Sequence, residues 1–371
     1  MKIKQRIRAL CFVIVLVLSL LVTSAIMTPK WITGTSPITH QIDGFYDLPK
    51  NSVDVLFLGS CNIYNAFNPL ILWEREGIPG YVLGSSDQEL WNSYYYLKEA
   101  LDYQKPKVVV LETLMFTYEE SPDPNEAYHR RAVDYMRLSS HKYELTKKFI
   151  EVENAWNQEN EIATMDPLLN QFGYLFPLIR YHSRWSELTV EDFSYLCDKQ
   201  NPMGMGGTPV FTYPDAPVTN YTFSAKEGET VTVKEGVMEY FLQLKELCDE
   251  NGIELLLVKS PTMHYWNSAH NEIMKDIAQA YDIPFLDYNL LLEPNSNYFH
   301  ENRRLRLNAY GMQVFSDSLS DYLVENYALT PTQNQEAIAY WNTGVQSYNR
   351  NVELQRESDS FWFITRLLKQ Q

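Results

Sequence analysis

The sequence predicts an α/β protein with a parallel β-sheet, attached to a membrane by one N-terminal helix. Short apolar runs, each long enough for one buried strand, alternate with segments in which apolar residues recur every three to four positions. This alternation implies parallel strands joined by right-handed crossovers. A separate uncharged run near the N-terminus is long enough to cross a bilayer. We therefore expect a three-layer α/β/α body with a parallel sheet, a helical insertion and a transmembrane helix.

The predicted anchor is residues 9–28, whose uncharged run spans roughly 28 Å at 1.5 Å per residue. Residues 1–8 form a basic tail with four Lys and Arg side chains, whereas only Lys30 follows the run closely. The positive-inside rule then places the N-terminus in the cytoplasm and residues 29–371 outside the cell membrane. The alternative is a cleaved signal peptide, with small residues at 23–25 as the cleavage site.

The body begins with the apolar run VDVLFLGS, which is typical of a strand covered on both faces. Pro106 precedes the clearest strand, KVVVLETL, and the segment between these two strands has the apolar spacing of a helix. The predicted strands are 53–60, 81–86, 107–114, 253–260 and 283–289. The predicted helices are 66–77, 88–104, 235–250, 268–281, 309–326 and 334–348.

Between residues 120 and 235 the alternation stops, and we interpret this region as an insertion packed against the sheet or as a long lid. It contains an aromatic cluster at 173–185 and a Gly/Pro-rich loop at 201–217. A polar and aromatic tail, about 327–371, ends the chain. The extracytoplasmic domain is thus residues 29–371, with this insertion and this tail.

The net charge limits the classes of binding partner, and the cysteine content limits the possible disulfides. The total charge is −16, and because the first 30 residues carry five basic and no acidic side chains, residues 31–371 stand at −21. A body this acidic argues against nucleic acid as a partner. Outside the anchor there are three cysteines, Cys61, Cys197 and Cys248, without CxxC spacing. Cys197 and Cys248 either form a disulfide or remain two unpaired thiols.

Reactive groups in a parallel sheet collect where the strands end at their carboxyl edge. Four such ends carry small or polar residues, namely Gly59–Asn62, Gly84–Asp87, Glu112–Thr113 and Lys259–Pro261. The first turn offers backbone N–H groups for an oxyanion, and Gly84 allows a second N–H to approach the same point. We expect no metal and no cofactor at this edge.

Taken together, these segments resemble the SGNH/GDSL hydrolase superfamily. The similarity is carried by residues 42–112, by FPLIRYHSRWSEL (176–188), VKSPT (258–262) and PFLDYN (284–289), and by LNAYG (307–311). It is greatest to the membrane-anchored bacterial branch that includes the D-alanyl transfer protein of teichoic acid and the alginate O-acetyltransferases. The resemblance implies an SGNH-like, flavodoxin-like core, and esterase or O-acyltransferase chemistry on cell-envelope polymers.

The catalytic positions of that family are substituted here. The nucleophilic serine corresponds to Cys61, and the aspartate and histidine of the DxxH motif correspond to Arg303 and Arg306. The expected binding residues are Ser60, Asn62, Gly84, Asn308, His182 and Arg184. The pair His182 and Arg184 belongs to the insertion, where the alternative role is to anchor its helices, with Arg184 stacked on Trp185.

These substitutions change the chemistry that we expect. A serine hydroxyl needs a neighbouring base, whereas a thiol ionises more readily, above all beside arginine. Arginine cannot accept a proton, so the site has no evident general base. His300 would replace the missing histidine only if the loop were rearranged.

Our leading hypothesis is therefore a catalytically impaired accessory or binding component for acyl modification of cell-surface polymers, in which the two arginines hold an anionic group. The expected partners are a membrane-bound O-acyltransferase-type protein and a cell-surface polysaccharide or teichoic-type polymer. The alternative is an active esterase or O-acyltransferase that carries the acyl group on Cys61 as a thioester. A third hypothesis is a purely structural envelope protein.

Overall fold

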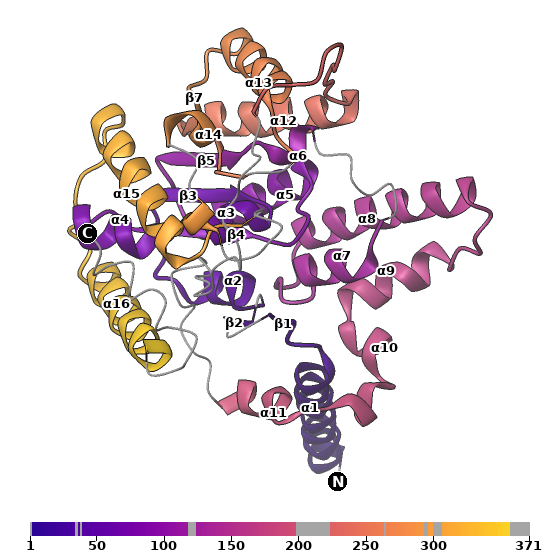
Figure 1. Ribbon diagram of the computed structural model, residues 1–371. Helices are drawn as coiled ribbons and strands as arrows, with labels where there is room; N and C mark the ends of the chain where they lie inside the picture. Colours follow the sequence, from indigo (N-terminus) through magenta and orange to yellow (C-terminus); the bar gives the residue numbers. More distant parts are fainter. Residues whose placement is uncertain are drawn as a thin grey trace.

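The computed structural model describes residues 2–33, 36–37, 39–117, 124–197, 223–262, 265–292, 296–299 and 306–356. Within these ranges the chain is an α/β protein with a parallel five-stranded sheet, which confirms the predicted class. Helices surround the sheet, and a hairpin of two helices and one long isolated helix extend from this body (Figure 1).

The sheet has the strand order β4-β3-β5-β6-β7, and all neighbouring strands are parallel. Its strands are β3 (Val55–Gly59), β4 (Gly80–Gly84), β5 (Val108–Glu112), β6 (Glu254–Lys259) and β7 (Phe285–Asp287). Four of them lie within segments that the sequence predicts as strands, and β4 begins one residue before its predicted range of 81–86. The chain order reverses at β3, because β4 lies on one side of it and β5 on the other. Such a switch point is where open parallel sheets bind ligands.

The strands are apolar on both faces because each face is covered. Leu56 and Leu58 belong to one hydrophobic cluster, together with side chains of α5 (Leu90–Leu101) and α12 (Glu235–Asn251). Val55 and Phe57 point the other way, into a second cluster with α15 (Ala309–Asn326). The period-two alternation of a strand explains this division.

The helices that connect the strands also follow the prediction, with one difference. The segment 66–77 is predicted as one helix but contains a break, because Asn68 caps α4 and Pro69 occupies its first turn. The body helices are α3 (Cys61–Ala66), α4 (Pro69–Glu76), α13 (Ser268–Ala280), α14 (Tyr288–Leu291), α15 and α16 (Gln335–Arg356), besides α5 and α12. Short elements before and after them are β1 (Ile32–Thr33), β2 (Ser36–Pro37), α2 (Thr39–Asp43), η1 (Gly44–Asp47) and η3 (Ser296–Tyr298).

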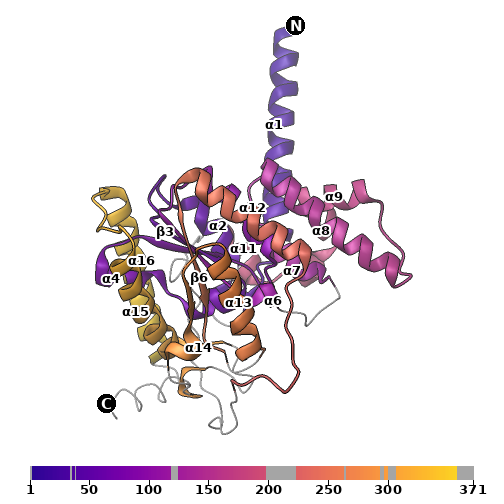
Figure 2. The same cartoon turned by 90° about the horizontal axis from the view of Figure 1, so that it is seen from above.

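The predicted insertion is helical where it is described. It contains α6 (Leu114–Thr117), α7 (Glu126–Val133), α8 (Ser140–Glu159), α9 (Pro167–Leu175), α10 (Pro177–Tyr181), η2 (Arg184–Glu187) and α11 (Val190–Cys197). Helix α8 packs on α5, and α9 folds back on α8. Figure 2 shows this hairpin projecting from the body next to α1. The Gly/Pro-rich loop at 201–217 lies outside the described residues.

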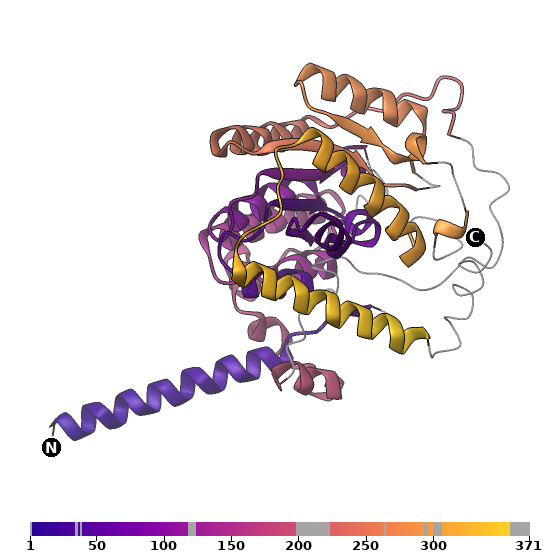
Figure 3. The ribbon, with the colours of Figure 1, turned by 90° about the vertical axis from the view of Figure 1, so that its left-hand side faces the viewer.

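The N-terminal helix α1 (Lys2–Met27) is longer than the predicted anchor, because the basic residues expected as a tail form its first turns. It contains the one described stretch, Ile3–Met27, that is long and apolar enough to cross a membrane. Almost all of this helix is exposed and projects away from the body (Figure 3). Only its C-terminal end contacts protein, through α10 and α11. That this helix crosses a bilayer, and in which direction, stays a prediction.

The predicted C-terminal tail contains a helix, α16, that packs on the body. Helix α16 packs against α4, and its Trp341 is fully buried. The Trp341 indole donates to the Gly80 carbonyl at 3.3 Å, and the Trp73 indole donates to Asn342 at 3.0 Å. The aromatic residues of this segment therefore complete the body core.

Candidate functional site

The candidate site lies at the switch point of the sheet, where β3 passes into α3. Two glycines bring the ends of β3 and β4 unusually close. A Cβ atom on Gly84 would lie 2.8 Å from the Gly59 carbonyl, and one on Gly59 would lie 2.7 Å from the Glu112 Cβ. Gly84 is therefore required for strand packing, whatever its part in binding.

Ser60 and Asn62 shape the turn that follows β3. Ser60 is the N-cap of α3, and its Oγ accepts the Asn62 backbone N–H at 3.4 Å. Asn65 donates its side-chain amide to the Cys61 carbonyl at 2.6 Å. The sequence predicts that backbone N–H groups of this turn bind an oxyanion. The Asn62 N–H is, however, already bonded to the Ser60 Oγ.

Cys61 begins α3 and is a partly exposed free thiol. Burial raises its pKa above the ordinary value, and the negative charges of Asp87 and Glu112 raise it further. The guanidinium of Arg306 lies within hydrogen-bonding reach of the sulfur and lowers the pKa, but the net shift is upward. The thiol is therefore neutral near pH 7, and neutral thiols are poor nucleophiles.

The structure thus brings together Cys61 and Arg306, which are distant in sequence, as the resemblance implies. Arg303 lies outside the described residues, as does His300. Asn308 is fully buried, and its side chain is occupied by the chain itself. It caps α15 by accepting the Gly311 N–H at 2.9 Å, and it donates to the carbonyls of Asn297 and Phe299 at 2.7 and 3.1 Å. It shapes the loop that carries Arg306.

Three further residues belong to this site. Tyr64 is not singled out by the sequence, whereas Ser86 and Asp87 are placed at the strand end 84–87 but without a role. Tyr64 lies one turn after Cys61 on α3, and its hydroxyl is 3.1 Å from the Ser86 Oγ. Asp87 has a left-handed backbone, with φ of 48°, and acts electrostatically on Cys61. Ser86 and Asp87 follow the carboxyl end of β4, so their place in sequence was the available signal.

The insertion also reaches this edge. Arg131 of α7 acts electrostatically on Tyr64, as Arg306 does. Its guanidinium lies over the rings of Trp31 and Tyr128, at 5.0 and 5.4 Å from their centroids. A second arginine, held by aromatic side chains, thus adds to the positive field around Tyr64.

Glu89 lies two residues after Asp87 and has an altered acidity. Burial, and then the charge of Asp87, raise the pKa of this carboxyl to about 7, against a smaller opposing effect of Lys234. A carboxyl group that titrates near neutrality is common at functional sites but also occurs in structural networks.

A buried ion pair joins the carboxyl ends of the neighbouring strands β5 and β6. Lys259 of β6 donates to Glu112 of β5 at 2.7 Å, and both side chains are fully buried. Glu112 also accepts the Ser260 hydroxyl at 3.1 Å and the Leu114 N–H at 3.0 Å. Because its carboxylate has three donors, Glu112 joins β5 and β6 and is not free to act as a base.

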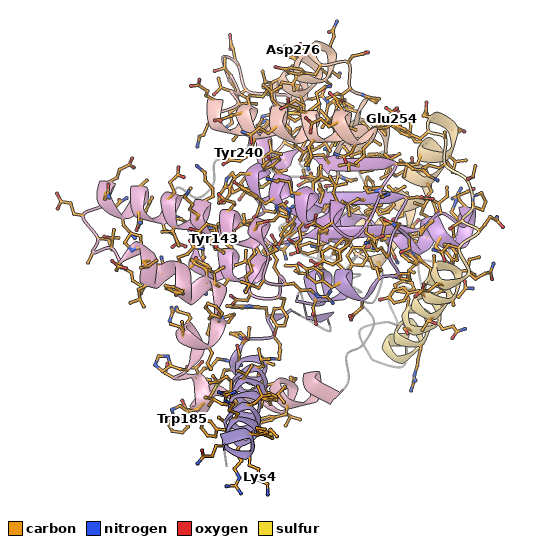
Figure 4. All side chains as sticks on the ribbon, turned by 180° about the vertical axis from the view of Figure 1, so that it is seen from behind. Lys4, Tyr143, Trp185, Tyr240, Glu254 and Asp276 are labelled. Carbon is orange, nitrogen blue, oxygen red and sulfur yellow. The ribbon has the colours of Figure 1, made fainter. Side chains whose placement is uncertain are left out.

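The structure does not place the predicted pair His182 and Arg184 at this edge. The Arg184 guanidinium donates to the Met27 carbonyl at 2.8 Å and to Asp192 at 2.8 and 2.9 Å. His182 is exposed and contacts the Ile179 carbonyl. Both lie in the segment that packs on α1, so the anchoring alternative holds for Arg184. The expected stacking partner, Trp185, is exposed beside α1 (Figure 4).

The sequence left open whether Cys197 and Cys248 form a disulfide or remain unpaired thiols. Cys248 of α12 is a free buried thiol, and burial raises its pKa to about 12. This finding favours the unpaired alternative over a disulfide. The side chain of Cys197 is outside the described part of the chain.

Comparison with protein-family models gives no match to this chain. Comparison with curated proteins gives no match either.

Proposed function

We propose that the protein is an SGNH-like, membrane-anchored binding component that holds an anionic group of a cell-envelope polymer at the carboxyl edge of its sheet. The observation that carries this proposal is the position of Arg306, whose guanidinium meets Cys61 at the switch point. In the resembling family this position holds the histidine base. A cation that cannot accept a proton there favours binding over catalysis.

The state of Cys61 supports the same conclusion. Its pKa is raised, so the thiol stays protonated near neutrality. The charged groups that act on it most are Arg306, Asp87 and Glu112, and Glu112 is occupied by Lys259. A thioester mechanism would need a thiolate and an acid for the leaving alkoxide. The accessory role in acyl modification, beside a membrane-bound O-acyltransferase-type partner, is therefore the function that we favour.

The first test is hydrolysis of p-nitrophenyl acetate by the full chain in detergent. The comparison protein is the triple variant Cys61→Ser, Arg303→Asp, Arg306→His, which restores the family residues. We expect no turnover by the natural chain and measurable turnover by the variant. A burst of p-nitrophenol with an acetyl group on Cys61 of the natural chain would instead establish the thioester enzyme.

The second test measures binding directly. Soluble poly(glycerol phosphate) is titrated into the full chain by calorimetry, with neutral dextran as the uncharged comparison. We expect Arg306→Gln to weaken binding of the phosphate polymer at least tenfold. The matched control is Arg75→Gln, which removes a surface arginine paired with Asp317 and should leave binding unchanged. Equal binding by both variants would contradict the proposal.

A further inference from the structure

The segment between α8 and the end of α11 exposes many apolar side chains. We call residues 160–194 the arm. Along α9 and α10 an exposed stripe recurs every three to four residues, while Gln171 and Tyr174 on the other face of α9 are buried against α8. The stripe consists of Leu168, Phe172, Phe176 and Ile179. In a soluble body such an amphipathic face would be buried, so here something else covers it.

The end of the arm is more exposed still. Trp185 is 71% exposed, Val190 is 79% exposed and Phe193 is 51% exposed. These are large apolar side chains on the short helices η2 and α11. Asp192, in the same segment, is buried and paired with Arg184, whereas Glu187 and Glu191 are exposed beside the apolar side chains.

The arm is continuous with the membrane-crossing candidate α1. Helices α10 and α11 both contact α1, and Arg184 donates to the carbonyl of Met27, the last residue of α1. Lys30 is buried beside them and donates to the carbonyls of Ala25 and Thr28 at 2.6 and 2.7 Å. These cations cap the negative end of the helix dipole. The arm therefore lies beside the C-terminal end of α1 (Figure 2).

The central part of the arm carries few charges. Residues 167–186 contain no acidic side chain, and their two arginines pair within the protein, Arg180 with Glu126 and Arg184 with Asp192. The whole arm has five acidic and two basic side chains, a net charge of −3, so its apolar side chains and not its charge favour lipid. Exposed tryptophan, phenylalanine and leucine beside arginine are typical of helices that lie in the membrane interface.

We propose that the arm is a second membrane-attachment surface. Its exposed apolar side chains lie in the interfacial layer of the leaflet from which α1 emerges, and Trp185 lies among the lipid headgroups and upper acyl chains. The proposal rests on α1 crossing the membrane and does not depend on the function of the Cys61 site. It implies that the body is held in one orientation close to the lipid, rather than swinging on a single helix.

The test measures where Trp185 lies in the full chain. The protein is incorporated into nanodiscs of phosphatidylcholine and phosphatidylglycerol, with or without bromine on the acyl chains, and tryptophan emission is recorded. Trp185→Phe identifies the contribution of this residue. In a matched control, Trp185→Phe is combined with Leu291→Trp, which moves the exposed indole to α14. Leu291 is 57% exposed, and α14 lies on the side of the body opposite α1 (Figure 2).

We expect brominated lipid to quench the Trp185 emission strongly and aqueous iodide to quench it weakly. The indole at position 291 should show the reverse pattern. Quenching of Trp185 by iodide but not by bromine would overturn the proposal, because the residue would then be in water. Protection from both quenchers would also overturn it, because another protein or a second copy would then cover the arm. Incorporation into nanodiscs is verified separately by co-elution.

Discussion

At the scale of single residues, the acidity of Cys61 depends on two neighbours with opposite effects. Arg306 lowers the pKa of the thiol, and Asp87 raises it. Arg306→Gln removes the lowering effect, so we expect the pKa to rise and alkylation by iodoacetamide at pH 8 to slow. Asp87→Asn removes the raising effect, so alkylation should become faster. Asparagine tolerates the left-handed backbone at this position.

Alkylation is followed by mass spectrometry of the peptide that contains Cys61, so that the other cysteines do not contribute. Because thiolate is the reacting species, the rate follows the ionised fraction until pH exceeds the pKa. A change of the same sign in both variants would mean that altered access, and not charge, controls the thiol.

A second prediction at this scale concerns the pH dependence of stability. The pKa of Glu89 is near the ordinary value of 4.5 in the unfolded chain and about 7 in the folded chain. Below pH 4.5 it is protonated in both states. Between the two values the unfolded chain releases the proton first, so the fold loses up to about 3 kcal/mol as pH rises. Glu89→Gln stays neutral, and it should therefore be more stable than the natural chain at pH 8 and equally stable at pH 4.

Urea denaturation of the detergent-solubilised chain at pH 4 and at pH 8 measures the free energy of unfolding at each pH. The comparison variant is Glu250→Gln, an exposed acidic residue on α12, which should change stability by less than about 0.5 kcal/mol at either pH. If Glu89→Gln were equally destabilising at both pH values, the carboxyl group would have a structural role that its protonation does not control.

Sequence reasoning found the residues of the site that lie in a recognisable order and missed those that depend on the turn geometry. Cys61 and Arg306 follow from the resemblance, and the structure brings them together. Tyr64 was missed because an aromatic residue on a short helix is normally assigned to the core. For Arg184 the sequence left open a binding role or an anchoring role, and the structure places its guanidinium on the Met27 carbonyl. No sequence pattern shows that its insertion folds back onto α1.

At the scale of secondary-structure elements, the packing of β3 and β4 depends on glycine. In Gly84→Ala the new Cβ would meet the Gly59 carbonyl at 2.8 Å, which is backbone and cannot move aside. We expect a loss of about 1–3 kcal/mol in the free energy of unfolding, as for other overpacked cores. The matched control is Gly236→Ala in the first turn of α12, where nothing lies within 4 Å of the added atom.

The control should gain about 0.5–1 kcal/mol, because alanine is favoured over glycine in a helix. Thermal unfolding of the two variants beside the natural chain measures this difference. Equal stability of Gly84→Ala and Gly236→Ala would show that the strands separate without cost.

The contact between the ends of β5 and β6 depends on the buried ion pair of Lys259 and Glu112. Lys259→Met leaves the Glu112 carboxylate buried with only its Ser260 and Leu114 donors, and should cost about 3–5 kcal/mol. The double variant with Glu112→Gln removes the unpaired charge and keeps an acceptor, so it should recover part of this loss. A double-mutant cycle in urea measures the coupling. Additive losses would exclude the pair as the cause.

Helices and strands were predictable where the apolar pattern is strong. They were less predictable where a capping residue determines the end of a helix. Four of the five strands in the sheet lie within their predicted ranges, and β4 begins one residue early. They were predictable because a buried parallel strand is a continuous apolar run. The break between α3 and α4 depends on Asn68 as a cap, which a hydrophobic pattern does not show. The start of α1 at Lys2 was missed because charge, which defines the membrane boundary, does not end a helix.

At the scale of the whole molecule, the described part of the predicted tail packs on the body. The sequence predicts a polar and aromatic tail from Tyr327 with a helix at 334–348, and the structure places α16 against α4 with Trp341 and Ala337 fully buried. Amphipathic helices that pack on an outer surface are easily taken for separate segments, because only a narrow stripe of each is apolar. The closing contacts join residues far apart in sequence, such as Trp341 and Gly80.

This contact gives the last prediction. Trp341→Ala removes a fully buried indole and its hydrogen bond to Gly80, so it should cost about 3–5 kcal/mol in the free energy of unfolding. Gln346→Ala, on an exposed face of the same helix, should cost less than about 0.5 kcal/mol. Urea denaturation measures both, and proteolysis shows whether α16 detaches first. If Trp341→Ala frees α16 while the sheet unfolds at its original urea concentration, the helix is an appendage. If both are lost together, α16 belongs to the same cooperative unit as the sheet that carries Cys61.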